Sequence, residues 1–146
     1  MLSTIGFSSP VWSFALGITD EVLALIAVDL LLAVVIGGTT RAAAIGKLRL
    51  DRLAGIRTSA TMASPEAWVA GHQAAWPISA GVSIFSAVSV GAALVLSVAD
   101  YDAAARAAAL APIAAVILAV IPVIVLAHRA ATDINTDPQE LSHSRS

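Results

Sequence analysis

The sequence predicts an all-α membrane protein with three transmembrane helices, a short N-terminal interfacial helix and an amphipathic cytoplasmic loop. Of the 146 residues, 58% are hydrophobic and only 12% are charged, whereas soluble domains carry about 25% charged residues. The apolar residues gather in three long runs, and a basic cluster separates the first run from the second. A surface with so little charge needs lipid as its solvent, so the chain is expected to be a multi-pass membrane protein.

The first transmembrane helix is expected at about 19–38. Thr19 can cap its start, Asp20 and Glu21 suit the positive end of the helix, and a Gly-Gly-Thr-Thr stretch at 37–40 is expected to end it. About 20 residues at 1.5 Å each span a hydrocarbon core of roughly 30 Å. Before this span, a short apolar stretch with Trp12 is expected to lie on the membrane surface, although it could instead lengthen the span.

Asp29 lies near the middle of this first span, where a carboxylate is costly and functional sites are common. One interpretation is therefore a functional, titrating group. The other is a neutral or hydrogen-bonded aspartate that docks the first helix against Ser83, Ser86 or Ser89 of the second span.

Five of the eight basic residues fall between the first two spans, at Arg41, Lys47, Arg49, Arg52 and Arg57. Basic residues beside spans mark the cytoplasmic side. The loop 41–77 and the C-terminus are therefore expected inside, and the N-terminus outside. Apolar residues interleave with the arginines, which predicts contact with anionic lipid along Arg41–Arg57. A solvated linker that only fixes orientation is the alternative.

The second and third spans are expected at about 78–98 and 107–127, as an antiparallel hairpin. Both carry small residues at four-residue steps, which let helix backbones approach closely in lipid. These predicted packing residues are Ser79, Ser83, Ala87 and Gly91 on one helix and Ala111, Ala115 and Ala119 on the other. Pro122 is expected to kink the third span. Residues 1–131 then form a single membrane domain, and 132–146 a polar cytoplasmic tail.

The segment from Gly55 to His72 is the only long polar stretch between hydrophobic runs. Ser64-Pro65-Glu66 has the pattern of an N-cap, a first helical residue and an acidic first turn. Trp68, His72 and Trp76 follow at four-residue spacing on one helical face. An interfacial aromatic belt is the ordinary interpretation of that face, and His72 as a proton sensor is the alternative.

The same segment resembles the signature of the SdpI family, which comprises small bacterial membrane proteins named for an immunity protein against a secreted toxin. The matching residues are Gly55, Ile56, Arg57, Thr58, Thr61, Met62, Ser64, Glu66, Trp68 and His72. The resemblance implies a multi-pass protein of the bacterial inner membrane that binds a toxin or a signalling partner. Arg57 and Glu66 could pair across the loop, while Thr58, Thr61 and Ser64 could satisfy backbone groups.

Enzymatic chemistry has little support, because the sequence has no cysteine, no phosphate-binding loop and no cluster of metal ligands. We therefore expect no catalytic residue, cofactor, metal or nucleic acid. The expected function is non-enzymatic partner binding. An accessory subunit of a larger membrane complex and a small transporter or lipid-handling protein are the alternatives.

Overall fold

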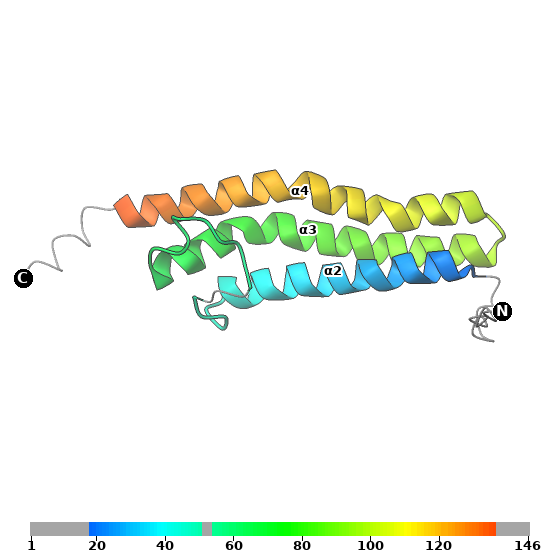
Figure 1. The fold of residues 1–146 in the computed structure, drawn as a ribbon, viewed down its shortest axis with the longest axis horizontal. Coiled ribbons are helices and arrows are strands. Elements are labelled where there is room, and N and C mark those ends of the chain that lie inside the picture. The colour runs from blue at the N-terminus through cyan, green and yellow to red at the C-terminus, as the bar shows by residue number, and fades with distance from the viewer. Residues whose placement is uncertain (1–17, 51–53, 137–146) are drawn as a thin grey trace, which may run out of the picture.

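The computed structural model describes residues 18–50 and 54–136, and three long helices account for most of them (Figure 1). They are α2 (Asp20–Ala44), α3 (Pro65–Val98) and α4 (Asp102–Thr136), with no strand in these two ranges. All three are long and apolar enough to cross a membrane. The predicted all-α class with three spanning helices is confirmed. The predicted interfacial helix before residue 18, and the end of the chain from 137 onward, lie outside the described residues.

Helix α2 begins where the sequence predicts but ends later. The Thr19 hydroxyl accepts a hydrogen bond from the Val22 amide at 3.4 Å, as an N-cap does. The helix then continues through Gly37 and Gly38 to Ala44, so the predicted end near residue 38 is wrong. In lipid the backbone must bond internally, which keeps glycines helical there. Gly46, with φ of +72°, follows the true end and donates to the Ala43 carbonyl at 3.0 Å.

Helix α3 begins well before the predicted second span. Ser64 caps it by accepting from the Ala67 amide at 3.1 Å, and Pro65 opens the first turn. The predicted helix start at Ser64 is thus confirmed, and the 34-residue helix runs unbroken through Pro77, so that residues 65–77 of the predicted loop 41–77 belong to the same helix as the second span. At ~1.5 Å per residue its length is about 51 Å, far more than the roughly 30 Å that a span requires.

Helix α4 also exceeds its predicted bounds at both ends. A short turn links α3 to it, in which Asp100 has φ of +61°. The helix continues through Pro112 and Pro122 to Thr136. Residues 132–136, predicted as the start of a polar tail, are therefore its last turn.

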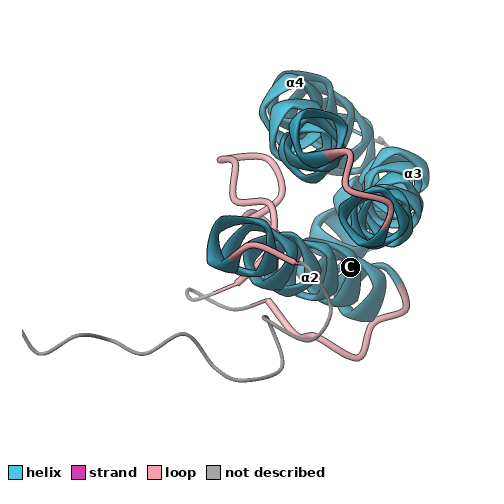
Figure 2. Ribbon diagram, turned by 90° about the vertical axis from the view of Figure 1, so that its right-hand side faces the viewer, coloured by secondary structure: helices cyan, strands magenta, loops and turns pink. Residues whose placement is uncertain are grey.

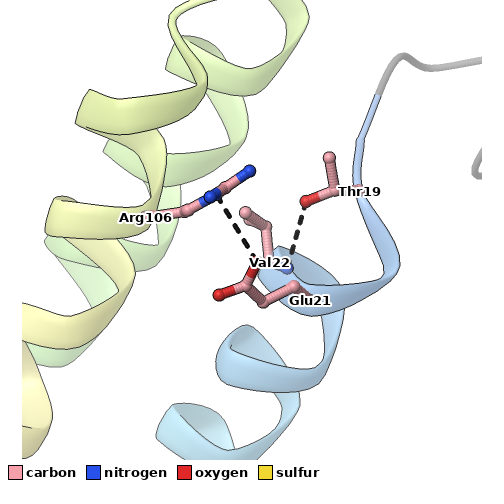
Figure 3. A network of polar contacts seen from close by, with 4 residues as sticks. All are labelled: Thr19, Glu21, Val22 and Arg106. Carbon is pink, nitrogen blue, oxygen red and sulfur yellow. Dashed lines mark hydrogen bonds and ion pairs between the residues drawn. The ribbon is translucent and has the colours of Figure 1, made fainter.

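The helices form a three-sided bundle in which α3 runs antiparallel to both α2 and α4 (Figures 1 and 2). Helix α3 packs along both neighbours, whereas α2 and α4 touch each other sparingly. Where α2 begins, Arg106 of α4 lies 3.5 Å from Glu21 (Figure 3). Both side chains are about half exposed, so the pair contributes at most about 1 kcal/mol. The loop between α2 and α3 lies at the opposite end, which we call the loop end.

The apolar core gathers toward the end of the bundle where α2 begins. Its buried members are Ile18, Val22, Ile26, Val90, Ala93, Ala105 and Ala109. The buried face of α3 follows seven-residue steps, at Ser79, Ser86 and Ala93. The predicted four-residue stripe is wrong beyond its first members, because Ala87 and Gly91 are exposed.

Ser83, the second member of that stripe, faces α2 and not α4. Its hydroxyl donates to the Ala33 carbonyl at 3.2 Å. A methyl group on Gly37 would lie 2.5 Å from the same hydroxyl oxygen. On α4 the predicted residues Ala111, Ala115 and Ala119 are only partly buried, whereas Ala105, Ala109 and Pro112 form the buried face. The two predicted stripes therefore do not face each other.

Gly37 allows α2 to approach α3 closely. Its role can be tested by comparing a substitution at Gly37 with the same substitution at Gly38. We expect Gly37→Leu to destabilise the bundle by about 1–3 kcal/mol, because an overpacked contact forces the helices apart. Gly38→Leu is the matched control, since nothing lies within 4 Å of its added carbon. Unfolding in mixed detergent micelles, followed by circular dichroism, compares the two variants. Equal stability of both variants contradicts this packing.

Candidate functional site

The loop between α2 and α3 is held to the helices by hydrogen bonds from buried side chains. The loop contains most of the motif residues. The residue to which it is anchored is His72, which belongs to α3. The His72 side chain is fully buried. Its Nε2 atom accepts a hydrogen bond from the Ile56 amide at 2.9 Å. Its Nδ1 atom lies 2.8 Å from the Trp68 carbonyl oxygen, to which it can only donate. Together these two bonds fix a neutral imidazole that carries its proton on Nδ1.

His72 lies six residues before the apolar segment 78–98 of α3, at the loop end. Burial lowers the pKa of His72 from its ordinary value of 6.5, while the hydrogen bond to the Trp68 carbonyl raises it by less. The neutral form is also the one that the geometry requires, because a protonated Nε2 would point a hydrogen at the Ile56 N–H. Protonation of His72 therefore opposes docking of the loop.

Trp68 is buried beside His72, with 1% of its surface exposed. Its indole Nε1 donates to the Leu48 carbonyl at 3.0 Å, and the two ring centroids are 4.2 Å apart. The predicted aromatic belt is thus wrong for Trp68 and His72, which pack under the loop instead of facing lipid headgroups. Trp76 alone is partly exposed, with the Arg41 guanidinium 5.1 Å from its ring centroid.

Gly55 is required where the loop crosses these two rings. Its φ of +99° is a conformation that side chains rarely adopt. An added methyl group would lie 2.6 Å from the Trp68 ring and 2.7 Å from His72 Nε2. The motif glycine therefore allows the backbone to approach closely enough for the Ile56 amide to reach His72.

Thr58 and Thr61 fold the middle of the loop, as the sequence predicts. The fully buried Thr61 hydroxyl accepts from the Thr58 amide at 2.8 Å and donates to the Ile56 carbonyl at 2.9 Å. The Thr58 hydroxyl in turn accepts from the Thr61 amide at 3.1 Å. Ser64 caps α3, so all three predicted roles in satisfying backbone groups are confirmed.

Two residues that the sequence analysis did not single out also hold the loop. Asn135 of α4 donates to the Ala60 carbonyl at 3.1 Å, and Gln73 of α3 donates to the Ala44 carbonyl at 3.1 Å. Asn135 lies in the predicted polar tail, because no local pattern in the sequence shows that α4 continues that far. Gly71 completes the packing, because its missing side chain leaves room for Thr61 and the Ala127 carbonyl.

Arg57 and Glu66 are the charged residues of the motif, and neither side chain holds the loop in this way. Both are exposed. They do not pair with each other, since Glu21 with Arg106 is the one ion pair within the described residues. The predicted Arg57–Glu66 pair is therefore wrong. Arg57 on the loop and Glu66 in the first turn of α3 are thus exposed charges beside residues that are bonded inward.

Asp29 lies away from this loop, inside the bundle. It is 1% exposed, and neither carboxyl oxygen has a hydrogen-bond partner. The predicted hydrogen bond to serines of α3 is wrong, and Ser83 in particular bonds to the Ala33 and Ser79 carbonyls. Within residues 18–50 and 54–136, no three His, Asp or Glu side chains gather as metal ligands do.

Three spanning helices and a polar loop docked at one end define the class: a small multi-pass membrane protein with a structured surface loop. The chain belongs to the SdpI/YfhL protein family, whose sequence model matches residues 47–126. That match covers the loop from Lys47, the whole of α3, and α4 as far as Leu126. Comparisons with curated proteins and with solved structures gave no match.

The docking of the loop can be tested at Gly55. We expect Gly55→Ala to release the loop, because the methyl group meets Trp68 and His72 in addition to the strain of a positive φ. Gly46→Ala is the matched control, since it has a similar strain of about 1–2 kcal/mol but no atom within 4 Å. The rate of trypsin cleavage after Arg57 reports release. Equal rates for the two variants contradict the close approach at Gly55.

The His72 contacts predict a pH dependence with a definite sign. Docking lowers the pKa of His72 below its ordinary value of 6.5. Between the lowered pKa and about pH 6.5, the released state therefore binds more protons than the docked state. Docking is thus fully stable above about pH 6.5 and weakens as the pH falls below it. The indole N–H resonance of Trp68 in NMR spectra should report this loss. His72→Gln, which can make both hydrogen bonds, should remove the dependence, whereas His128→Gln should retain it.

Proposed function

We propose that this protein is a non-enzymatic membrane protein that binds a protein partner through its docked loop. The observation that carries the proposal is that the motif residues fall into two groups, those that hold the loop and those whose charged side chains are exposed. Six motif residues, Gly55, Thr58, Thr61, Ser64, Trp68 and His72, hold or cap the loop, while Arg57 and Glu66 are exposed. The bonded residues fix the path of the loop, and the two charged side chains that the fold leaves exposed are available to a partner.

The lengths of α3 and α4 support a site at the membrane surface. Helix α3 is about 20 Å longer than the hydrocarbon core, and its loop-end turns are the polar ones. The loop then lies at or beyond the headgroups, where a partner can reach it. A fixed loop also lowers the entropic cost of binding, because its conformation is set beforehand.

The direction of insertion is part of this proposal. Arg41, Lys47, Arg49 and Arg57 gather at the loop end, which by the positive-inside tendency is the cytoplasmic face of a bacterial plasma membrane. The exposed basic residues then contact anionic lipid, while Arg41 over Trp76 sits at headgroup level. The C-terminus lies inside and the N-terminus outside.

Membership of the SdpI/YfhL family indicates the kind of partner. The family is named for an immunity protein against a secreted toxin, so the partner is either a membrane-active peptide or a signalling protein at the inner surface. The exposed Arg57 and Glu66 suit a partner that offers both a carboxylate and a basic group.

A photo-crosslinker at the exposed Ser59, two residues from Arg57, tests this function in cells. We expect a discrete adduct with one protein partner, and Arg57→Gln should reduce its yield by about tenfold, as the loss of a charged hydrogen bond at an interface does. Arg49→Gln is the control, because Arg49 is also an exposed arginine of the loop. Equal yields from both variants, at equal protein levels, contradict a binding role for Arg57.

A further inference from the structure

A cavity of about 200 Å³ lies between α2 and α4 in the loop-end half of the bundle. Its walls are Val35 and Thr39 of α2, Ala119 and Val123 of α4, Ser79 and Val82 of α3, and Ile56 of the loop. Two of its lining residues, Val35 and Val120, are about half exposed, so the cavity opens sideways between α2 and α4. That opening faces lipid, since both helices are apolar there.

Ser79 provides an unpaired polar group in this apolar cavity. It is 2% exposed, and its hydroxyl has no hydrogen-bond partner. Helical serines in such surroundings usually bond to the carbonyl four residues earlier, as Ser83 does to Ser79 at 3.0 Å. An unpaired buried hydroxyl is costly. Because the oxygen itself is buried in its present rotamer, rotation of the hydroxyl toward the cavity is needed before a ligand with an acceptor oxygen can satisfy it.

The size of the cavity suits part of a hydrocarbon chain. The lining residues of α4 span Val116 to Val123, or about 10 Å of helix. An apolar cavity of about 150 Å³ holds a benzene molecule, so 200 Å³ accommodates a stretch of hydrocarbon chain.

The depth of Ser79 points to the ester group of a phospholipid. Ser79 follows Pro77 at the loop end of the apolar segment of α3, three residues after Trp76, which lies beside Arg41. Tryptophan and arginine mark the headgroup level of a span. One turn deeper, where hydrocarbon begins, a glycerophospholipid carries its acyl ester carbonyls.

We propose that one glycerophospholipid is held at this site, with an acyl chain in the cavity and an ester carbonyl accepting from the Ser79 hydroxyl. Apolar lining alone would not retain a lipid, because the surrounding lipid tails are equally apolar. The hydroxyl and the concave shape distinguish this site from the rest of the helix surface. The proposal is independent of partner binding at Arg57.

Native mass spectrometry tests the proposal on the full chain, reconstituted in vesicles of dioleoyl phosphatidylethanolamine and phosphatidylglycerol and then released in mild detergent. The expected result is one retained phospholipid per chain. Ala119→Phe, which fills the cavity, should lower the retained fraction at least fivefold. Ala114→Phe, on an exposed position of the same helix that does not line the cavity, should leave it unchanged.

Ser79→Ala keeps the test decisive if Ala119→Phe fails to fold. Removing an unpaired hydroxyl does not destabilise a fold, while loss of one hydrogen bond should lower lipid retention about two- to tenfold. Circular dichroism confirms the helical content of each variant. The proposal is overturned if no lipid is retained, if Ser79→Ala retains as much as the wild type, or if Ala119→Phe alters the oligomeric mass but not lipid retention.

Discussion

The hydrogen bond from the Ile56 amide to His72 is the constraint on which the loop end depends. An irregular loop near a bilayer must find partners for its backbone groups, because lipid offers none. Here those partners come from side chains: His72, Thr61 and Asn135 bond to loop residues, while Trp68 and Gln73 bond the carbonyls of Leu48 and Ala44 where α2 gives way to the loop. The glycine at 55 is needed because the His72 bond requires contact between backbone and ring. Most of the motif residues thus serve to fix one conformation of the loop backbone.

Much of the fold could be predicted from the sequence because its signals are local. Long apolar runs identify spans whatever their packing, and the caps at Thr19 and Ser64 depend on a few neighbouring residues. The ends of the helices were harder, since Gly37 and Pro77 break helices in water but not where neighbouring helices and lipid enforce internal hydrogen bonds. The position of Asn135 on the last turn of α4 depends on its contact with Ala60, 75 residues earlier, and no local pattern encodes it.

The buried faces were predicted poorly for a geometric reason. Four-residue steps advance a helix by about 400°, so Ser79 and Gly91, three steps apart, differ by about 120° around α3. Seven-residue steps drift only about 20° each, and these connect the buried Ser79, Ser86 and Ala93. Because small residues occur on every face of α3, composition could not select the face. For the candidate site, the sequence identified most of the residues that hold the loop, but it missed Gln73 and Asn135 and did not show which motif side chains point inward. That division follows from the three-dimensional path of the loop, which buries Trp68 and leaves Arg57 exposed.

The unbroken course of α3 has a mechanical consequence. The same 34-residue helix carries His72 near one end and packs into the core through Val90 and Ala93 near the other. The helix is continuous between the two, although Pro77 removes one of its backbone hydrogen bonds. A displacement of the docked loop against His72 therefore acts on the same helix that forms the core at the far end. One continuous element thus joins the polar loop on one side of the bundle to the turn around Asp100 on the other.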